Sequence, residues 1–289
     1  MSVTIKNEYL TAIINEKGAE LTSLSANQIE YIWQADPNYW GRHAPILFPF
    51  VGRLKNDQYT YQGENYPMGQ HGFARDKKFE LLEQTAEKAT FILKSDAETK
   101  KIYPFDFVLI VSYEVWGEGL RIRFEVQNPS SGELIFALGG HPAFNIPLEE
   151  NLTFDDYFIA FSPQKSRIKI PLEGPFANLD QKTLGQTNTN IQLSHDLFKE
   201  DALIYETRGL NSYTVGSEDS KHNVTVTYNN IPYVGFWSPM PKEAPFLCIE
   251  PWWGFADTVN STGKLEDKAG MQHLPANETF KTEFSITIH

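Results

Sequence analysis

The sequence predicts an all-β protein, an antiparallel β-sandwich or barrel-like architecture with a few short helices. Apolar and polar residues alternate with period two in several segments, which is the pattern of half-buried strands. The 20 Phe and 13 Tyr among 289 residues suit pleated sheet surfaces better than helices. Because β-rich chains of this length often fold as one unit, we expect a single domain over residues 1–289.

Strand segments recur along the chain, and short turns connect some of them. Residues 59–68 are expected to form a strand or a hairpin. Residues 105–115 and 120–127 are expected to form a hairpin, joined by a WGEG turn whose glycines supply the backbone freedom. Residues 222–230 and 279–289 are further candidate strands. In the last of these, alternate Phe and Ile residues share one face, so we expect that face to be buried.

Helical patterns are scarce. Residues 95–102 begin with Ser95 and Glu98 at the spacing of a capping box, which predicts a short helix. Residues 193–201 are a second candidate for a short helix. The polar stretch 171–190 has no clear period and is expected to be a long surface excursion.

The charge balance excludes some classes of partner. The 37 acidic residues outnumber the 25 basic ones, for a formal net charge of −12. A field of this sign repels phosphate backbones and anionic lipids, so we expect neither nucleic acid nor a membrane surface as a partner.

Targeting and disulfide signals are missing from the sequence. No stretch approaches the roughly 20 apolar residues of a membrane span, and the first residues lack the pattern of a signal peptide. Cys248 is the single cysteine and is expected to act as a small buried hydrophobe. The sequence therefore predicts a soluble, cytoplasmic protein without an internal disulfide.

The stretch GGHPAFNIP follows the apolar run of residues 133–138, which is expected to be a buried strand. Gly139 and Gly140 permit close backbone approach, and Pro142 cannot donate to a sheet ladder, so the strand is expected to end at His141. Functional side chains often lie at strand ends. His141 is therefore a candidate for acid/base chemistry, with a core histidine in a turn as the alternative.

The stretch FLCIEPWWGFAD carries the most informative carboxylate. Phe246, Cys248 and Glu250 share one strand face, and Pro251 is expected to end the strand. A carboxylate among apolar residues is costly unless it is paired or functional, which favours a functional role for Glu250.

Three basic groups and one acidic group complete the candidate set. Arg53 follows Gly52 after a run with two prolines, and QHGFARD places His71 and Arg75 in one loop. Asp201 directly precedes the strand-like ALIY. Metal-ligand spacings such as HxxxH, HExxH and CxxC are absent, as are phosphate-binding glycine motifs and a GxSxG elbow, so we expect no metal site. The set suits proton transfer on a small hydroxylated molecule.

Four stretches, LFPFVGRL, HGFARD, GGHPAFNIP and CIEPWWGFAD, occur in this order. They resemble the aldose 1-epimerase (galactose mutarotase) superfamily, particularly its LacX-like branch, over nearly the whole chain. HGFAR and HPxFN are fairly specific as a pair. The resemblance implies one large antiparallel β-supersandwich with an open cleft and no organic cofactor. It also implies interconversion of the α and β anomers of a free hexose such as galactose or glucose.

The resemblance assigns roles to individual residues. His141 in HPAFN matches the general acid of the family, and Glu250 in CIEPW matches its general base. His71 in HGFAR matches a second active-site histidine, which holds sugar oxygens near the reacting centre. Arg53 falls where the family keeps a substrate-binding arginine. Asp201 is similar to the aspartate that binds sugar hydroxyls.

Arg75 leaves the substrate open. Well-known galactose mutarotases have a leucine-histidine-glycine sequence without an arginine where this chain has HGFAR. Hexose 6-phosphate mutarotases share the arginine, and their basic side chains hold a phosphate. The resemblance therefore also fits a hexose 6-phosphate mutarotase.

Two further interpretations remain. Trp237, Trp252 and Trp253 would suit a non-catalytic carbohydrate-binding protein on the same scaffold, because indole rings stack on sugar faces. Glycoside hydrolysis by Glu250 with Asp201 would require their carboxyls to lie about 5 Å or about 6.5–9.5 Å apart. In each case the expected partner is a small-molecule sugar, and the protein is expected to be a monomer or a homodimer.

Overall fold

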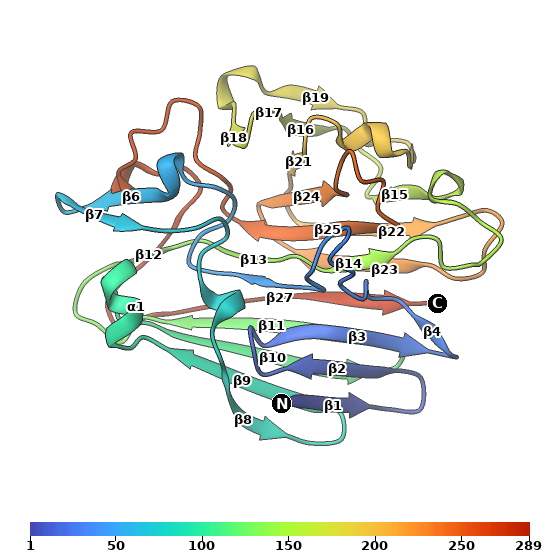
Figure 1. Cartoon of the computed structure of the whole chain (residues 1–289), viewed down its shortest axis with the longest axis horizontal. Helices are drawn as coiled ribbons and strands as arrows, with labels where there is room; N and C mark the ends of the chain where they lie inside the picture. The colour runs from blue at the N-terminus through green and yellow to red at the C-terminus, as the bar shows by residue number, and fades with distance from the viewer.

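The computed structural model describes residues 1–289 and consists mainly of antiparallel strands, as the sequence predicts (Figure 1). Its largest element is a nine-stranded antiparallel sheet. In spatial order the strands are β20 (Ile191–Gln192), β15 (Phe158–Ser162), β22 (Leu210–Gly216), β23 (Val224–Asn229), β27 (Thr279–Ile288), β11 (Gly119–Gln127), β10 (Val108–Trp116), β9 (Lys88–Lys94) and β8 (Glu80–Gln84).

A second sheet carries the candidate site residues. Its strands in spatial order are β19 (Thr183–Gly185), β16 (Arg167–Ile170), β21 (Leu203–Glu206), β24 (Tyr233–Trp237), β25 (Phe246–Trp253), β13 (Leu138–Gly140) and β5 (Ile46–Leu47), and β14 (Ala143–Asn145) also pairs with β25. Both β13 and β14 therefore lie along the same side of β25, one after the other.

The remaining strands form smaller sheets. A four-stranded sheet contains β1 (Ser2–Lys6), β2 (Thr11–Asn15), β3 (Glu20–Ala26) and β4 (Ile29–Glu30), and three two-stranded pairs are β6 (Gln58–Tyr61) with β7 (Glu64–Pro67), β12 (Leu134–Phe136) with β26 (Gln272–Leu274), and β17 (Leu172–Glu173) with β18 (Phe176–Ala177). The four-stranded sheet, blue in Figure 1, lies against β9 and β10.

Helices are few and short. The α-helix is α1 (Ala97–Ile102), and the 3₁₀ helices are η1 (Lys55–Asp57), η2 (Ala74–Asp76), η3 (Phe154–Asp156), η4 (Leu179–Gln181), η5 (His195–Phe198) and η6 (Leu265–Asp267). None of them has the length and apolar character needed to cross a membrane.

The period-two segments form strands as predicted. In β11 and in the second half of β27, buried residues alternate with more exposed ones. The 105–127 hairpin is present, with Trp116 opposite Gly119 at its turn, and the 59–68 segment forms the β6–β7 hairpin. The buried faces belong to one cluster of 73 hydrophobic residues that reaches every large sheet, so the two main sheets share a continuous core.

Two local predictions are wrong in detail. The cap of α1 is Asp96 rather than Ser95, and its capping-box partner is Thr99, whose backbone N–H donates to the Asp96 carboxylate over 2.7 Å. The Ser95 hydroxyl instead donates to Asp106, 3.2 Å away, because the chain turns back to the strand that follows the helix.

The second correction concerns Pro251, which does not end its strand, since β25 continues to Trp253. Pairing with β13 reaches Trp252, and pairing with β14 begins at Cys248, so Pro251 lies beside the gap between these two short strands. A proline is tolerated there because the ladder is already interrupted.

Candidate active site

A cavity of about 550 Å³ lies over one face of the second sheet. This volume falls in the range of about 300–1,000 Å³ that is common for small-molecule sites. The seven candidate residues from the sequence all line it, and these are Arg53, His71, Arg75, His141, Asp201, Trp237 and Glu250. The structure therefore brings together side chains that lie up to about 200 positions apart in the sequence.

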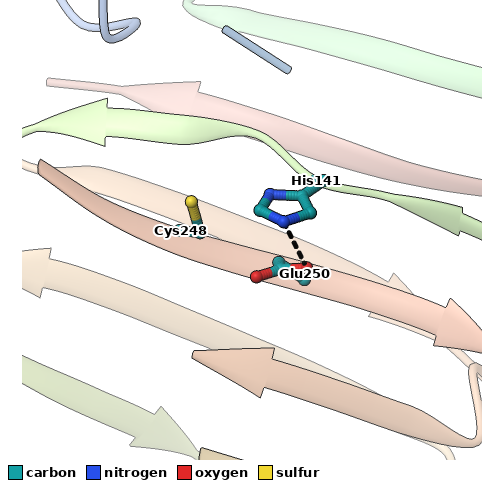
Figure 2. A group of neighbouring side chains, drawn as sticks. All are labelled: His141, Cys248 and Glu250. Atoms are coloured by element: carbon teal, nitrogen blue, oxygen red, sulfur yellow. Dashed lines mark ion pairs between the residues drawn. The ribbon is translucent and has the colours of Figure 1, made fainter. Parts of the chain in front are cut away.

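His141 and Glu250 form a buried pair at the cavity wall. His141 directly follows β13, where Gly139 is needed because a Cβ there would lie 2.7 Å from the Trp252 side chain. Glu250 projects from the middle of β25, and its Oε2 lies 3.2 Å from His141 Nε2 (Figure 2). The side chains are only 7% and 2% exposed. Nδ1 of His141 and Oε2 of Glu250 are buried and form no hydrogen bond, so the 3.2 Å approach is a close contact and not an aligned hydrogen bond.

Burial shifts the two pKa values in opposite directions. It lowers the pKa of His141 to about 3 and raises the pKa of Glu250 well above its ordinary value, with the nearby Asp201 charge adding to the second shift. Both shifts disfavour charge, so the pair favours a neutral imidazole beside a carboxylic acid. A general acid at His141 and a general base at Glu250 require an imidazolium beside a carboxylate. That state holds the same single proton, which lies on the other side of the 3.2 Å contact.

Tryptophan rings hold His141 in place. The Trp40 ring stacks on the imidazole with centroids 4.8 Å apart, and Trp237 meets it edge-on at 5.8 Å. Trp40 was not a candidate from the sequence, because a lone Trp in a loop carries no local signal of its role. Trp252 also lines the cavity, whereas Trp253 packs in the core against Phe124.

The loops that carry Arg53 and His71 are joined by two reciprocal hydrogen bonds. The His71 backbone N–H donates to the Gly52 carbonyl over 2.9 Å, and the Gly52 N–H donates to Nδ1 of the His71 ring over 3.0 Å. Gly52 has φ +75°, and a Cβ there would lie 2.6 Å from Ala256. Only glycine therefore fits at this junction.

The Gly52 contact fixes the tautomer of His71. Since Nδ1 accepts a hydrogen bond, the ring proton of the neutral imidazole lies on Nε2. Burial lowers the pKa of His71 well below its ordinary value, and the neighbouring His141 and three arginines lower it further. His71 is thus a neutral N–H donor, and its ring lies 5.5 Å from that of His141.

Two arginines of the cavity lining meet at Gln70. The Arg53 side chain is 47% exposed and the Arg75 side chain is 17% exposed. Arg53 donates to the side-chain oxygen of Gln70, and Arg75 donates to the backbone carbonyl of Gln70 over 2.6 Å. Burial lowers the pKa of Arg75 to about 10, and Nε of Arg75 has no hydrogen-bond partner. Lys199, which the sequence did not single out, also lines the cavity. The cavity lining therefore contains three basic side chains beside the acidic Asp201 and Glu250, in a chain that is acidic overall.

Asp201 lies at the cavity wall just before β21. Its φ of +75° is unusual for a residue other than glycine, and its carboxylate accepts a hydrogen bond from the Ala202 N–H over 2.8 Å. Enclosure by the cavity walls raises the pKa of Asp201, and the Arg53 charge opposes that shift.

A buried ion pair supports the backbone around Arg53. Lys268 Nζ lies 3.0 Å from Asp257 Oδ1, with side chains 4% and 3% exposed. Asp257 also accepts a hydrogen bond from the Lys55 N–H over 2.9 Å, and its own N–H donates to the Arg53 carbonyl over 2.9 Å. Asp257 therefore anchors the chain at Arg53 and at Lys55, and Lys268 balances its buried charge. Nothing in the local sequence links residues 257 and 268 to this loop.

Comparison with known proteins places the chain in a family. The model of the aldose 1-epimerase family matches residues 1–286. The chromosomal LacX protein of Lactococcus lactis subsp. lactis is 34% identical over 299 residues, which cover 100% of this chain and 99% of that protein.

Solved structures agree with this assignment. A galactose mutarotase related enzyme from Lactobacillus acidophilus has a TM-score of 0.99 and 44% identity, covering 100% of this chain and 97% of that one. A galactose mutarotase-like protein from Lactobacillus casei ATCC 334 has a TM-score of 0.92 and 34% identity, with both chains fully covered. The chain therefore belongs to the aldose 1-epimerase family, in its LacX-like branch.

Proposed function

We propose that this protein is an aldose 1-epimerase that interconverts the α and β anomers of a free hexose such as galactose or glucose. Family membership supports mutarotase activity in general. The observation that carries the proposal is the buried contact of 3.2 Å between His141 and Glu250 at the wall of a hexose-sized cavity. An imidazole and a carboxyl group that together hold one proton are suited to general acid/base ring opening.

Ring opening of a pyranose requires two coordinated proton transfers. Glu250, as carboxylate, takes the proton from the O1 hydroxyl while His141, as imidazolium, delivers one to the ring oxygen, and the bond between C1 and the ring oxygen breaks. Rotation about C1–C2 turns the aldehyde over. Closure on the opposite face reverses both transfers, so the pair returns to its starting state and neither oxygen carries a full charge.

The other residues would hold the sugar during this cycle. The Nε2–H of His71 is fixed as a donor by the Gly52 contact and can bind a sugar oxygen next to His141. Asp201 and Arg53 offer an acceptor and a donor for hydroxyl groups, and Trp237 forms an apolar wall beside the imidazole. These are the binding roles that we propose for the set.

Polarimetry of freshly dissolved α-D-galactose and α-D-glucose tests the proposal. We expect the optical rotation to change faster than in an enzyme-free blank, with an initial rate proportional to protein concentration. If calorimetry shows sugar binding while the rotation changes at the blank rate, the protein is a carbohydrate-binding protein instead. If the protein accelerates anomer exchange of none of the aldoses tested, free or phosphorylated, the proposed activity is wrong.

The pH profile follows from the two pKa shifts. The working pair holds one proton, and it gains a second only as pH falls toward the His141 pKa of about 3. It loses its only proton as pH rises through the raised pKa of Glu250. We therefore expect constant activity from well above pH 3 up to that raised pKa and a loss of about tenfold per pH unit beyond it. Blank-corrected rates should show no loss of activity as pH falls through about 6.5, where an isolated histidine would gain a proton.

A second candidate substrate is a hexose 6-phosphate, because Arg53, Arg75 and Lys199 share one cavity in an acidic protein. If Arg75 holds a phosphate, Arg75→Ala should lower kcat/KM for galactose 6-phosphate by about 10–100-fold, the value of one charge-assisted hydrogen bond. The loss with galactose itself should be much smaller. Arg123→Ala, which removes an arginine paired with Glu114 and Glu283 on another sheet, serves as the control. Equal losses for the two sugars would assign Arg75 to the neutral ring instead.

A further inference from the structure

Cys248 lies beside the proposed acid/base pair. It precedes Glu250 by two residues on the same face of β25, and Figure 2 shows its sulfur projecting from the strand on the side where His141 lies. The ligand atoms of His141, Cys248 and Glu250 all lie within 4.8 Å of one another. All three side chains are buried, and Oε2 of Glu250 has no hydrogen-bond partner.

These three groups are all ordinary ligands of Zn²⁺. Bond lengths of about 2.0–2.3 Å in a tetrahedral site separate nitrogen from oxygen ligands by about 3.3 Å, and sulfur from either by about 3.5 Å. The His141–Glu250 distance of 3.2 Å already matches the first value. The cluster spans up to 4.8 Å, so its widest separation has to shorten by about 1.3 Å when the metal binds.

We propose that His141, Cys248 and Glu250 form an inhibitory site for Zn²⁺ or a similar thiophilic divalent cation. His141 and Glu250 line the cavity, so the cation reaches them from that side and the fourth coordination position faces the cavity. Three protein ligands with one position left for water is the usual arrangement of an open zinc site.

The charges of this site balance in the buried environment. Metal binding displaces two protons, one from the Cys248 thiol and one from the His141–Glu250 pair. A divalent cation with one thiolate, one carboxylate and one neutral imidazole is neutral overall. No uncompensated charge is therefore buried, which removes the main penalty of a metal in this position.

The consequence for activity rests on the proposed function. A bound cation occupies the ring nitrogen and the carboxylate that would transfer protons to the sugar, so metal and sugar binding exclude one another. Cys248 does not line the cavity and takes no part in the proposed proton transfers. Its role is limited to strengthening metal binding.

Cobalt absorption tests the site without reference to activity. Chelator-treated protein is titrated with Co²⁺, and we expect one equivalent to produce a thiolate-to-cobalt charge-transfer band that Zn²⁺ then abolishes, since Zn²⁺ binds more tightly than Co²⁺. In Cys248→Ala and Cys248→Ser the band should vanish, and the zinc dissociation constant should rise by at least about 10–100-fold. Where anomer exchange is measurable, Zn²⁺ should inhibit the parent protein, and a chelator should restore its activity. The Cys248→Ala variant should be inhibited only at higher Zn²⁺ concentrations.

The matched control is His273→Ala. His273 Nδ1 lies 3.0 Å from Glu133 on the surface, a histidine–carboxylate pair that has no thiol, so this variant should keep the full cobalt band. Absence of a thiolate band in the parent would overturn the proposal, as would equal zinc affinity in the parent and both Cys248 variants. A normal band in a protein that accelerates no mutarotation would leave the metal site standing and refute only the proposed activity.

Discussion

Glu250→Gln is expected to slow enzyme-dependent anomer exchange by about 10²–10⁴-fold, the contribution of one positioned acid/base group. Glutamine keeps the size of the side chain in a position that is only 1% exposed, but it cannot accept a proton. His141→Asn should produce a loss of the same order. Because the two residues share one proton transfer cycle, the double variant should be little slower than the slower single variant. Polarimetry of α-D-galactose or the identified substrate gives these rates.

Controls separate lost chemistry from lost folding. Glu133→Gln and His273→Asn change the same residue types in an exposed pair and should leave the rate unchanged. Thermal unfolding should show that Glu250→Gln folds as the parent does. A Glu250→Gln protein with more than about a tenth of parental activity would contradict the proposed base, because that loss is below the range of general base catalysis.

Lys268→Met is expected to lower the free energy of unfolding by about 3–5 kcal/mol, the typical cost of breaking a buried ion pair on one side. The change leaves the Asp257 carboxylate 3% exposed without its cation. Adding Asp257→Asn should restore part of the loss, since an amide oxygen can still accept the Lys55 N–H without carrying a charge. Urea unfolding of the parent, both single variants and the double variant measures this coupling.

The surface pair Lys101–Glu98 provides the comparison for this experiment. Its atoms lie 2.6 Å apart, but the side chains are 66% and 68% exposed, so Lys101→Met should cost less than about 1 kcal/mol. If Lys268→Met costs no more than Lys101→Met, the buried pair does not stabilise the loop that carries Arg53.

The parts of the fold that the sequence predicted are those with a local cause. Alternation of side chains along β11 and β27 follows from burial of one sheet face, so single segments carry enough information. The prediction that Pro251 ends its strand is wrong because proline is acceptable beside the gap between β13 and β14. These two strands lie about 110 positions away in the chain, so the local sequence does not reveal the gap. Strand ends depend on neighbours that a single segment does not contain.

Some residues of the candidate site carry a signal in the local sequence, and others do not. His141 and Glu250 could be found because proline, glycine and apolar neighbours make their positions unusual in the sequence itself. Trp40 and Lys199 carry no such mark, since an isolated aromatic or basic residue in a loop is common. The Lys268–Asp257 pair could not be predicted either, because its significance is the backbone that it holds near Arg53.

The reciprocal hydrogen bonds between Gly52 and His71 have a consequence for how this cavity can change over evolution. A single peptide group there decides which nitrogen of the imidazole carries hydrogen, and the adjoining residue is Arg53. If Arg53 binds the sugar as proposed, we expect an insertion or deletion in either loop to alter sugar preference and the tautomer of His71 together. Lys199 and Asp201 line the same cavity but form no hydrogen bond to either loop, so substitutions there are expected to alter specificity without altering the tautomer of His71.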